Sequence, residues 1–138
     1  MLYCITGNCF RENTMKTTEY LMIRPLEAFE CRTEYSFNEG VPGYGTFIIM
    51  YKGMPIGGFQ LLPYSNGDVY FHDFNISEDL RGRGIGTDVF PSILNHLFGS
   101  GYKNIRLQVS SSNPAALAIY KKFGFKVLES VECDDESE

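Results

Sequence analysis

The stretch Arg81-Gly82-Arg83-Gly84-Ile85-Gly86-Thr87 decides how the rest of this chain is understood. It follows Asp68–Ser77, whose extended aromatic pattern predicts a strand, and it opens a run of apolar residues at helical spacing, Ile85, Val89, Ile93 and Leu97. At the start of a helix the backbone N–H groups lack intrahelical partners and the dipole favours negative charge. The glycines let an oxygen approach the main chain, and the arginines add positive charge. The stretch therefore predicts a phosphate-binding loop.

Other phosphate-binding loops fit this stretch less well. A P-loop ends in Gly-Lys-Ser/Thr, and a dinucleotide-binding loop follows the first strand of a β-α-β unit and precedes a distant acidic residue. Neither pattern is present here. Taken alone, the stretch is also compatible with a plain glycine-rich turn or with an RNA-contacting Arg-Gly segment.

A second motif runs from Asn113-Pro114 to Gly124-Phe125. Asparagine at the N-cap, proline at the first helical position and glycine after the last turn predict a helix over Ala115–Phe123. The strand predicted at Ile105–Ser110 separates this helix from the first one, which Gly99 and Gly101 end. Pro91 lies inside the first helix and lacks an N–H group, so we expect a kink there.

The two motifs in this order resemble the GNAT superfamily of acyl-CoA-dependent N-acyltransferases. The family pattern R/Q-x-x-G-x-G/A matches Arg81, Gly84 and Gly86. The pattern N-x-x-A-x-x-x-Y-x-x-x-G-F matches Asn113, Ala116, Tyr120, Gly124 and Phe125. The resemblance extends from Glu19 to Val131.

This resemblance implies an α/β fold of the α+β kind, with a mixed, mainly antiparallel sheet that splays into a V and is flanked by helices. Local patterns predict its other parts: a strand at Glu19–Leu26, a short irregular helix from Leu26 to Phe37, a hairpin of Thr46–Tyr51 and Ile56–Leu62 turning at Lys52-Gly53, and a last short strand at Phe125–Val131. We expect one domain over residues 19–131, a flexible extension over 1–18 and an acidic tail over 132–138.

Two parts of the family fold are short in this sequence. About 20 residues separate the first two predicted strands, where relatives often have longer acceptor-binding helices. The C-terminus is also abbreviated, because the family's usual last strand is missing after Val131. An open sheet edge invites pairing, so we expect a second copy in a homodimer, or residues 1–14, to supply that strand.

The net charge of −5 hides an uneven distribution. Residues 1–80 carry −5, residues 81–131 carry +5 and the last seven residues carry −5. The basic segment contains both motifs expected to hold an anionic cofactor, and the acidic first part would form the acceptor side, which favours a cationic amine. The chain has no broad basic excess, which argues against nucleic acid as a partner.

The remaining composition points to an ordinary intracellular domain. No apolar run is long enough to cross a membrane, and the N-terminus lacks a basic region followed by an apolar core, so we expect a cytoplasmic protein without a membrane partner. Four cysteines (Cys4, Cys9, Cys31 and Cys133) form neither a C-x-x-C pair nor a cluster with histidine. We expect reduced thiols and no metal.

The resemblance implies a site for acetyl-CoA as co-substrate. Pantetheine would lie between the strands Phe74–Ile76 and Ile105–Ser110 and bond to main-chain groups near Phe74 and Ile76. A main-chain N–H near Ile76 would also bind the oxyanion. Arg81 and Arg83 would flank the pyrophosphate. The backbone amides expected to bind it belong to Gly82, Arg83, Gly84, Ile85, Gly86 and Thr87. Asn113 would either contact the cofactor or only cap its helix.

The resemblance also suggests the catalytic groups. Tyr120 occupies the position of a tyrosine that protonates the departing CoA sulfur, and a phenol is protonated at neutral pH. His72, predicted on the same strand face as Tyr70 and Phe74, is the candidate base, with a carboxylate or water as alternatives. Asp73 would point to the opposite face, and acids of the acceptor side (Glu30, Glu34 and Glu39) could bind the amine.

The sequence therefore predicts an N-acetyltransferase that moves an acetyl group from acetyl-CoA to a primary amine by direct attack. The amine would belong to a small molecule or to a protein, and the sequence does not select between them. The alternative is a non-catalytic acyl-CoA-binding sensor or interaction module.

Overall fold

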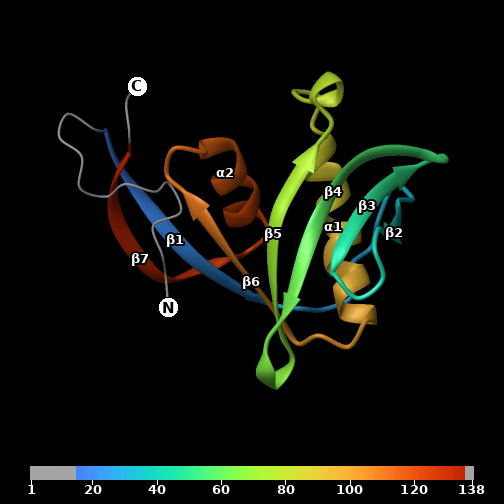
Figure 1. The fold of residues 1–138 in the computed structure, drawn as a ribbon, viewed down its shortest axis with the longest axis horizontal. Coiled ribbons are helices and arrows are strands. Elements are labelled where there is room, and N and C mark those ends of the chain that lie inside the picture. Colours follow the sequence, from blue (N-terminus) through green and yellow to red (C-terminus); the bar gives the residue numbers. More distant parts are fainter. Residues whose placement is uncertain (1–14, 136–138) are drawn as a thin grey trace. The chain divides into compact units, whose positions relative to one another are not determined.

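The computed structural model describes residues 15–135, and the side chains of residues 16–133. Figure 1 shows the strands and helices, whose bounds are β1 (Met15–Pro25), β2 (Ser36–Glu39), β3 (Thr46–Tyr51), β4 (Met54–Pro63), β5 (Asp68–Ile76), α1 (Ile85–Gly99), β6 (Asn104–Ser110), α2 (Pro114–Lys122) and β7 (Lys126–Asp135). They form two compact units. The central unit is Pro25–Ile105, and the terminal unit combines the chain up to Arg24 with the chain from Arg106.

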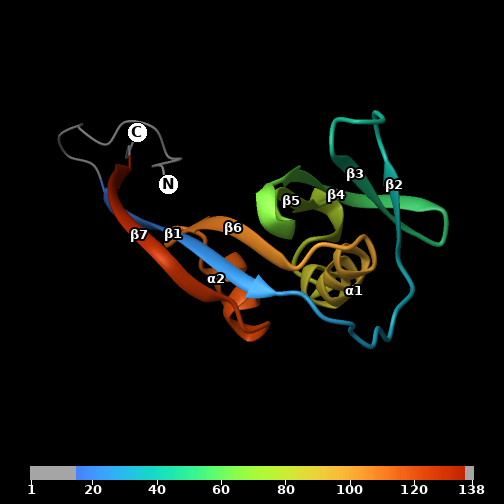
Figure 2. The ribbon, with the colours of Figure 1, turned by 90° about the horizontal axis from the view of Figure 1, so that it is seen from below.

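The central unit is an antiparallel sheet in the order β2-β3-β4-β5, with α1 on one face (Figure 2). The turn between β3 and β4 places Lys52 and Gly53 at φ of 48° and 79°. Two consecutive positive φ angles match the right-handed twist of the flanking strands, which is why this two-residue turn is favoured in hairpins. The predicted hairpin and the third strand after it are confirmed.

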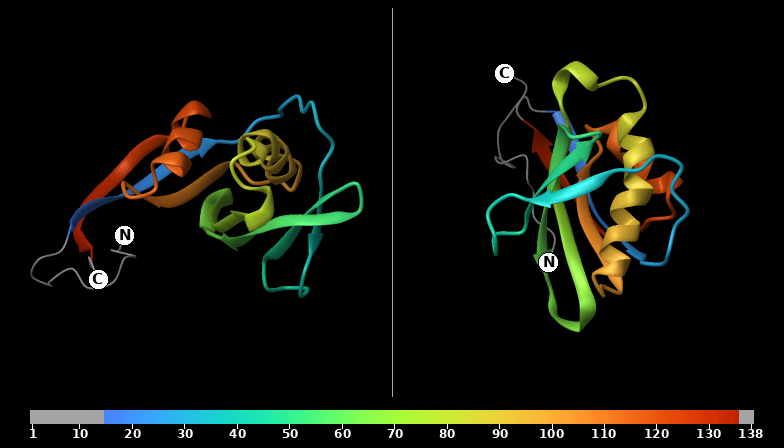
Figure 3. Two further views of the ribbon diagram at one scale, coloured as in Figure 1. Left: turned by 90° about the horizontal axis from the view of Figure 1, so that it is seen from above. Right: turned by 90° about the vertical axis from the view of Figure 1, so that its right-hand side faces the viewer.

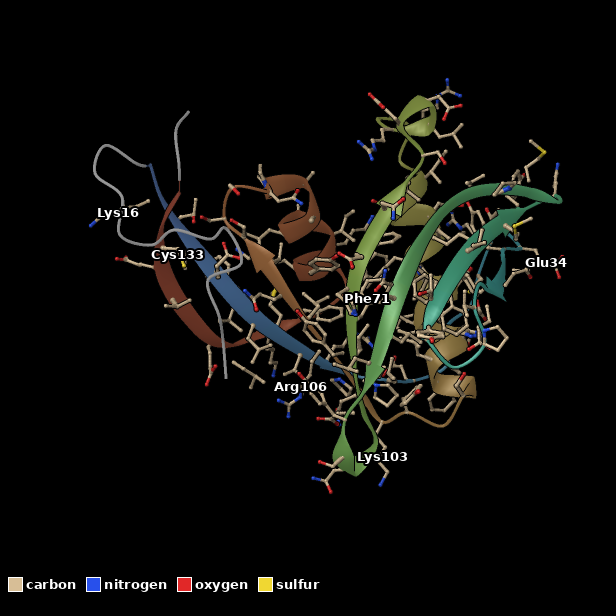
Figure 4. The ribbon with its side chains drawn as sticks, viewed as in Figure 1. Lys16, Glu34, Phe71, Lys103, Arg106 and Cys133 are labelled. Atoms are coloured by element: carbon tan, nitrogen blue, oxygen red, sulfur yellow. The ribbon has the colours of Figure 1, made fainter. Side chains whose placement is uncertain are left out.

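Phenylalanines form the core between this sheet and α1. Phe59 on β4 lies 5.3 Å from Phe47 and 5.4 Å from Phe71, measured between ring centroids. Phe71 on β5, labelled in Figure 4, reaches Phe90 on α1 at 5.9 Å. Phe59, Phe71 and Phe90 are almost fully buried, so the core fixes which face of β4 and β5 contacts the helix.

The terminal unit contains strands in the order β6-β1-β7 together with α2 (Figure 3, left). Strand β1 pairs antiparallel with β7 from Met15↔Asp135 to Ile23↔Lys126, with one irregularity after Leu21. Both strands are longer than predicted, since the ladder begins before Glu19 and continues past Val131. Backbone pairing needs no apolar side chains, and the acidic residues near the C-terminus concealed this strand from the sequence pattern.

Strand β1 lies beside the strand that the sequence predicts as the last one. Residues Met15–Pro25 lie between β6 and β7 and pair with β7. The pairing of a second copy, or of residues 1–14, with the open edge of the sheet stays a prediction. Residues 1–14 lie outside the described part of the chain.

The predicted helix between Leu26 and Phe37 is wrong. Residues 26–35, here called the strap, have no helix or strand, and β2 follows them. The backbone N–H of Leu26 donates to the carbonyl oxygen of Lys103 at 2.8 Å, and that of Phe29 donates to Oδ1 of Asn95 at 3.3 Å. Because these N–H groups bond to distant partners, they do not form the local bonds of a helix.

Most other predictions of secondary structure are confirmed. The helices α1 and α2 and the strand β6 lie within one or two residues of their expected bounds. Pro91 lies inside α1, and the kink expected there stays a prediction. The fold class is a mixed, mainly antiparallel α/β structure with flanking helices. The V-shaped splay concerns strands of both units and stays a prediction.

The cysteine prediction holds for one residue and fails for another. Cys31 is a free, exposed thiol, whereas Cys133 on β7 is disulfide-bonded. The side chain of Cys133 is buried. The spacing of the cysteines in the sequence did not predict this disulfide. Cys4 and Cys9 lie outside the described residues.

Candidate active site

The loop before α1 has the geometry of an anion site. Gly82 and Gly84 adopt left-handed conformations with φ of 77° and 76°, and Gly84 is the N-cap of α1. No side chain of the described residues caps this helix end. The first N–H groups of α1 therefore lack intrahelical partners at the positive end of the helix dipole. A Cβ atom added at either glycine would meet no atom within 4 Å, so the space in front of the loop is open.

The two arginines of this loop have different surroundings. Nε of Arg81 donates a 2.8 Å hydrogen bond to the carbonyl oxygen of Ile76, which ties the loop to the end of β5. Arg83 is exposed. The sequence assigned both residues to the pyrophosphate, and the structure adds a positioning role for Arg81.

A β-bulge at Asp73 changes the side-chain pattern of β5. Residues His72 and Asn75 pair with Gln60 and Gly58, so two residues of β5 oppose Phe59 alone. Asp73 has φ of 53°, a left-handed conformation that aspartate tolerates better than most residues. Beyond this bulge, Phe74 packs 5.5 Å from Phe71 and 6.0 Å from Phe90, on the side of α1.

His72 therefore does not share a face with Phe74, and this prediction is wrong. Its ring stacks on Tyr70 at 5.3 Å, on the other face of the sheet. Its Nδ1 lies 3.1 Å from Oδ2 of Asp73, which we had placed on the opposite face. A carboxylate accepts hydrogen bonds, so Nδ1 carries the proton and Nε2 is left to accept one. Only the bulge brings these two neighbours together, and strict strand alternation could not have found the pair.

In the terminal unit, the end of α2 holds Tyr120 through a backbone motif. Gly124 has φ of 84°, its N–H donates to the carbonyl oxygen of Lys121 at 3.1 Å, and the N–H of Phe125 donates to that of Tyr120 at 3.0 Å. These two bonds define a Schellman motif. Tyr120 is only 7% exposed, and burial raises its pKa to about 12. The phenol is therefore protonated at neutral pH and can donate that proton.

At the other end of α2, Asn113 is a helix cap. Its Oδ1 accepts a hydrogen bond of 3.2 Å from the N–H of Ala116, and Pro114 follows it at the first helical position. The capping role that we predicted is confirmed. Contact of Asn113 with a cofactor stays a prediction.

A comparison with protein families now identifies the chain. The model of the acetyltransferase (GNAT) family matches residues 10–125. The chain belongs to the GNAT family. The matched range includes the loop before α1 and Tyr120.

Individual relatives of this GNAT protein match only part of it, at low sequence identity. Mycothiol acetyltransferase of Corynebacterium glutamicum (strain R) is 30% identical over 84 residues, which is 60% of this chain and 29% of that protein. The chain thus spans less than a third of that relative.

Two solved structures share the GNAT fold. A GNAT-family acetyltransferase from Novosphingobium aromaticivorans has a TM-score of 0.66 at 13% identity, and the match covers 90% of this chain and 66% of that one. An Elizabethkingia anophelis GNAT acetyltransferase, solved with acetyl-CoA bound, has a TM-score of 0.56 at 16% identity, with coverage of 80% and 78%.

The strap of this GNAT protein lines a hollow in the central unit. Residues 31–37 of the strap and β2, together with Ser92, Asn95 and His96 of α1, line a hollow of about 690 Å³. Tyr35 fastens the strap, because its hydroxyl donates a 2.6 Å hydrogen bond to Oδ2 of Asp88 and its ring lies 5.5 Å from Tyr51. Glu34, labelled in Figure 4, lines this hollow, and Glu30 and Glu39 are exposed. Burial lowers the pKa of His96.

Sequence reasoning missed one buried acid. Glu19 on β1 is fully buried, and neither of its carboxylate oxygens has a hydrogen-bond partner among the described residues. The sequence shows it only as one of the acids of residues 1–80. The described residues contain no cluster of three or more histidines, cysteines and acids that could hold a metal. No helix in the described part of the chain is long and apolar enough to span a membrane.

Proposed function

We propose that this protein transfers an acetyl group from acetyl-CoA to a primary amine. The observation that carries the proposal is the uncapped N-terminus of α1 behind Gly82 and Gly84. Its open N–H groups suit a pyrophosphate, and Arg83 adds positive charge beside them. Family membership supports the same cofactor, and so does the fold shared with the Elizabethkingia anophelis protein, which was solved with acetyl-CoA bound.

The chain's own groups suit transfer by direct attack. The amine nitrogen forms a bond to the acetyl carbonyl carbon as the bond from that carbon to the CoA sulfur breaks. Nε2 of His72 accepts the proton that the amine loses, and Asp73 holds the imidazole through Nδ1. The Tyr120 hydroxyl donates a proton to the departing sulfur. Backbone groups near Phe74 and Ile76 would bind the pantetheine arm and the oxyanion, as the family resemblance suggests.

The alternative assigns structural roles to the same residues. Tyr120 would only fill the core next to Phe125, and His72 would only pair with Asp73 and stack on Tyr70. In that case the protein would bind acyl-CoA as a sensor or an interaction module. The strap favours this reading, because it contains none of the acceptor-binding helices that the family resemblance implies.

Two measurements separate these functions. Calorimetric titration with acetyl-CoA should show binding, and incubation with labelled acetyl-CoA and a panel of amines and peptides should give labelled products by mass spectrometry. Binding without transfer to any amine would support the sensor. Absence of binding would reject both functions. We also propose a cytoplasmic location and a homodimer. Light scattering of the purified chain tests the homodimer.

A further inference from the structure

The face of β4 and β5 that points away from α1 carries a ladder of aromatic rings. The ring centroids of Tyr64 and Tyr70 are 6.1 Å apart, and those of Tyr70 and His72 are 5.3 Å apart. Across the hairpin, Leu62 pairs with Tyr70. We call these residues, with Asp73, the aromatic face. Phe71, the neighbour of both Tyr70 and His72, instead packs toward α1, which lies on the other side of the sheet (Figure 2).

This aromatic face is accessible and ends in a negative charge. Leu62 is 53% exposed and Tyr64 is 47% exposed. The side chains of His72 and Asp73 are 32% and 67% exposed. The bulge turns the Asp73 carboxylate toward His72, at the end of the ladder away from Tyr64. Burial, then Tyr64 and then Asp73 raise the pKa of Tyr70, so its phenol is neutral over the physiological range.

We propose that the aromatic face binds a lysine side chain carried on an extended peptide. The electron-rich faces of tyrosine rings attract an ammonium ion, and a carboxylate beside them adds charge attraction. The methylene stem of lysine would lie along Tyr64 and Tyr70, with its ammonium group toward Asp73 and His72. This inference rests on the proposed function, since it names the amine that the same strand would present for acetylation.

The shape of the surface favours a peptide over a free small amine. Small ligands are usually enclosed by concave sites that bury most of their surface. Here the rings lie on an open sheet face. Ile48 on β3 pairs with Gly58 on β4, which places its side chain on the same face, and this apolar side chain is 39% exposed. A chain of several residues could cover Ile48 and Leu62 while its lysine lies on the rings. His72 also precedes Phe74 and Ile76 on β5, whose backbone is the proposed contact of pantetheine.

The test compares two peptides on the full chain without acetyl-CoA. One is a capped pentapeptide with a central lysine between leucines, and the other replaces that lysine with norleucine, which has a similar stem without the charge. Calorimetry or NMR titration should show the lysine peptide binding about 5-fold tighter or more. Tyr70→Leu and Asp73→Asn should each reduce this preference to about 2-fold or less. Asparagine tolerates the left-handed conformation at position 73, so the second variant keeps the bulge.

Tyr44→Leu is the matched control, because Tyr44 is 76% exposed and lies in the loop before β3. It should keep the full lysine preference and the acetyl-CoA affinity of the parent. Equal binding of the two peptides, no binding of either, or equally tight binding of free cadaverine would overturn the inference. A protein that prefers the lysine peptide but does not bind acetyl-CoA would instead refute the proposed function alone.

Discussion

The backbone N–H of Phe125 bonds to the carbonyl oxygen of Tyr120 at 3.0 Å, and the two rings lie 5.5 Å apart. The same turn thus closes the end of α2 and packs the first residue after Gly124 against the proposed catalytic acid. A Schellman motif commonly includes such a contact between the residue after the glycine and a residue of the last helical turn. In this protein the backbone conformation of Gly124 therefore governs the position of the Tyr120 ring.

Gly124→Ala should destabilise the protein by about 1 kcal/mol, because alanine is strained at a positive φ. The added Cβ would meet only Nε of Arg24, at an ordinary distance of 3.7 Å, so the cost is conformational. Gly99→Ala is the matched control, since Gly99 ends α1 without a positive φ and has open space for a Cβ. That variant should be neutral or more stable. Urea unfolding measures both, and equal changes would contradict the prediction.

Tyr120→Phe should lower turnover by about 100-fold or more and leave acetyl-CoA affinity nearly unchanged, because it removes only the donated proton. With the pKa of Tyr120 at about 12, the parent protein should keep the protonated, active phenol across the neutral and mildly alkaline range. Ionisation of this group should therefore cause no loss of turnover below about pH 11. Steady-state rates and calorimetry test the assignment, and unchanged turnover in the variant would remove Tyr120 from the mechanism.

The parts of this molecule that the sequence predicted are those set by local chemistry. Asn113, Pro114 and Gly124 carry their own backbone preferences, and so does the Lys52-Gly53 turn, and each adopts the expected conformation. The glycines before α1 belong to the same class. Motif spacing added the family, because two local signals in order are far more specific than one.

The parts that it missed depend on partners distant in sequence. The strap resembled a helix by spacing, but its N–H groups bond to Lys103 and Asn95. The long β1–β7 ladder joins residues more than a hundred positions apart. The face of His72 was misassigned because a bulge shifts the alternation of β5, and one extra residue moves every later side chain to the other face.

Gly84→Ala should weaken acetyl-CoA binding by about 10-fold, because it strains the N-cap of α1 and places a methyl group before the open N–H groups. Gly43→Ala is a matched control, since Gly43 has φ of 87° and, like Gly84, no atom within 4 Å of an added Cβ. Both variants should lose similar stability, about 1 kcal/mol. Calorimetry with acetyl-CoA should separate them, and equal affinities would mean that this loop does not bind the cofactor.

His96 should make the folded protein less stable in mild acid. Burial lowers its pKa, and its ring packs 5.2 Å from Phe37 and 5.9 Å from Phe47. The unfolded chain therefore binds a proton more readily, so stability is full above the unfolded pKa of about 6.5 and falls as the pH drops toward the folded value. His96→Gln should flatten the melting temperature between about pH 7 and about pH 5.5, whereas His72→Gln retains His96 and should retain the slope. An identical slope in both variants would contradict this origin.

Glu19→Leu should stabilise the protein by about 1–3 kcal/mol. A buried carboxylate that receives no hydrogen bond from the described residues loses its hydration without compensation from them, and leucine of similar length removes that cost. Glu129→Leu is the control, because Glu129 is exposed on β7 opposite Leu21 in the same ladder, and it should change stability by less than about 0.5 kcal/mol. Urea midpoints at unchanged slope test both variants. If Glu19→Leu instead lowers the midpoint, the carboxylate must gain a partner in the folded protein, and its neighbours on β1 and β7 are where that partner should be sought.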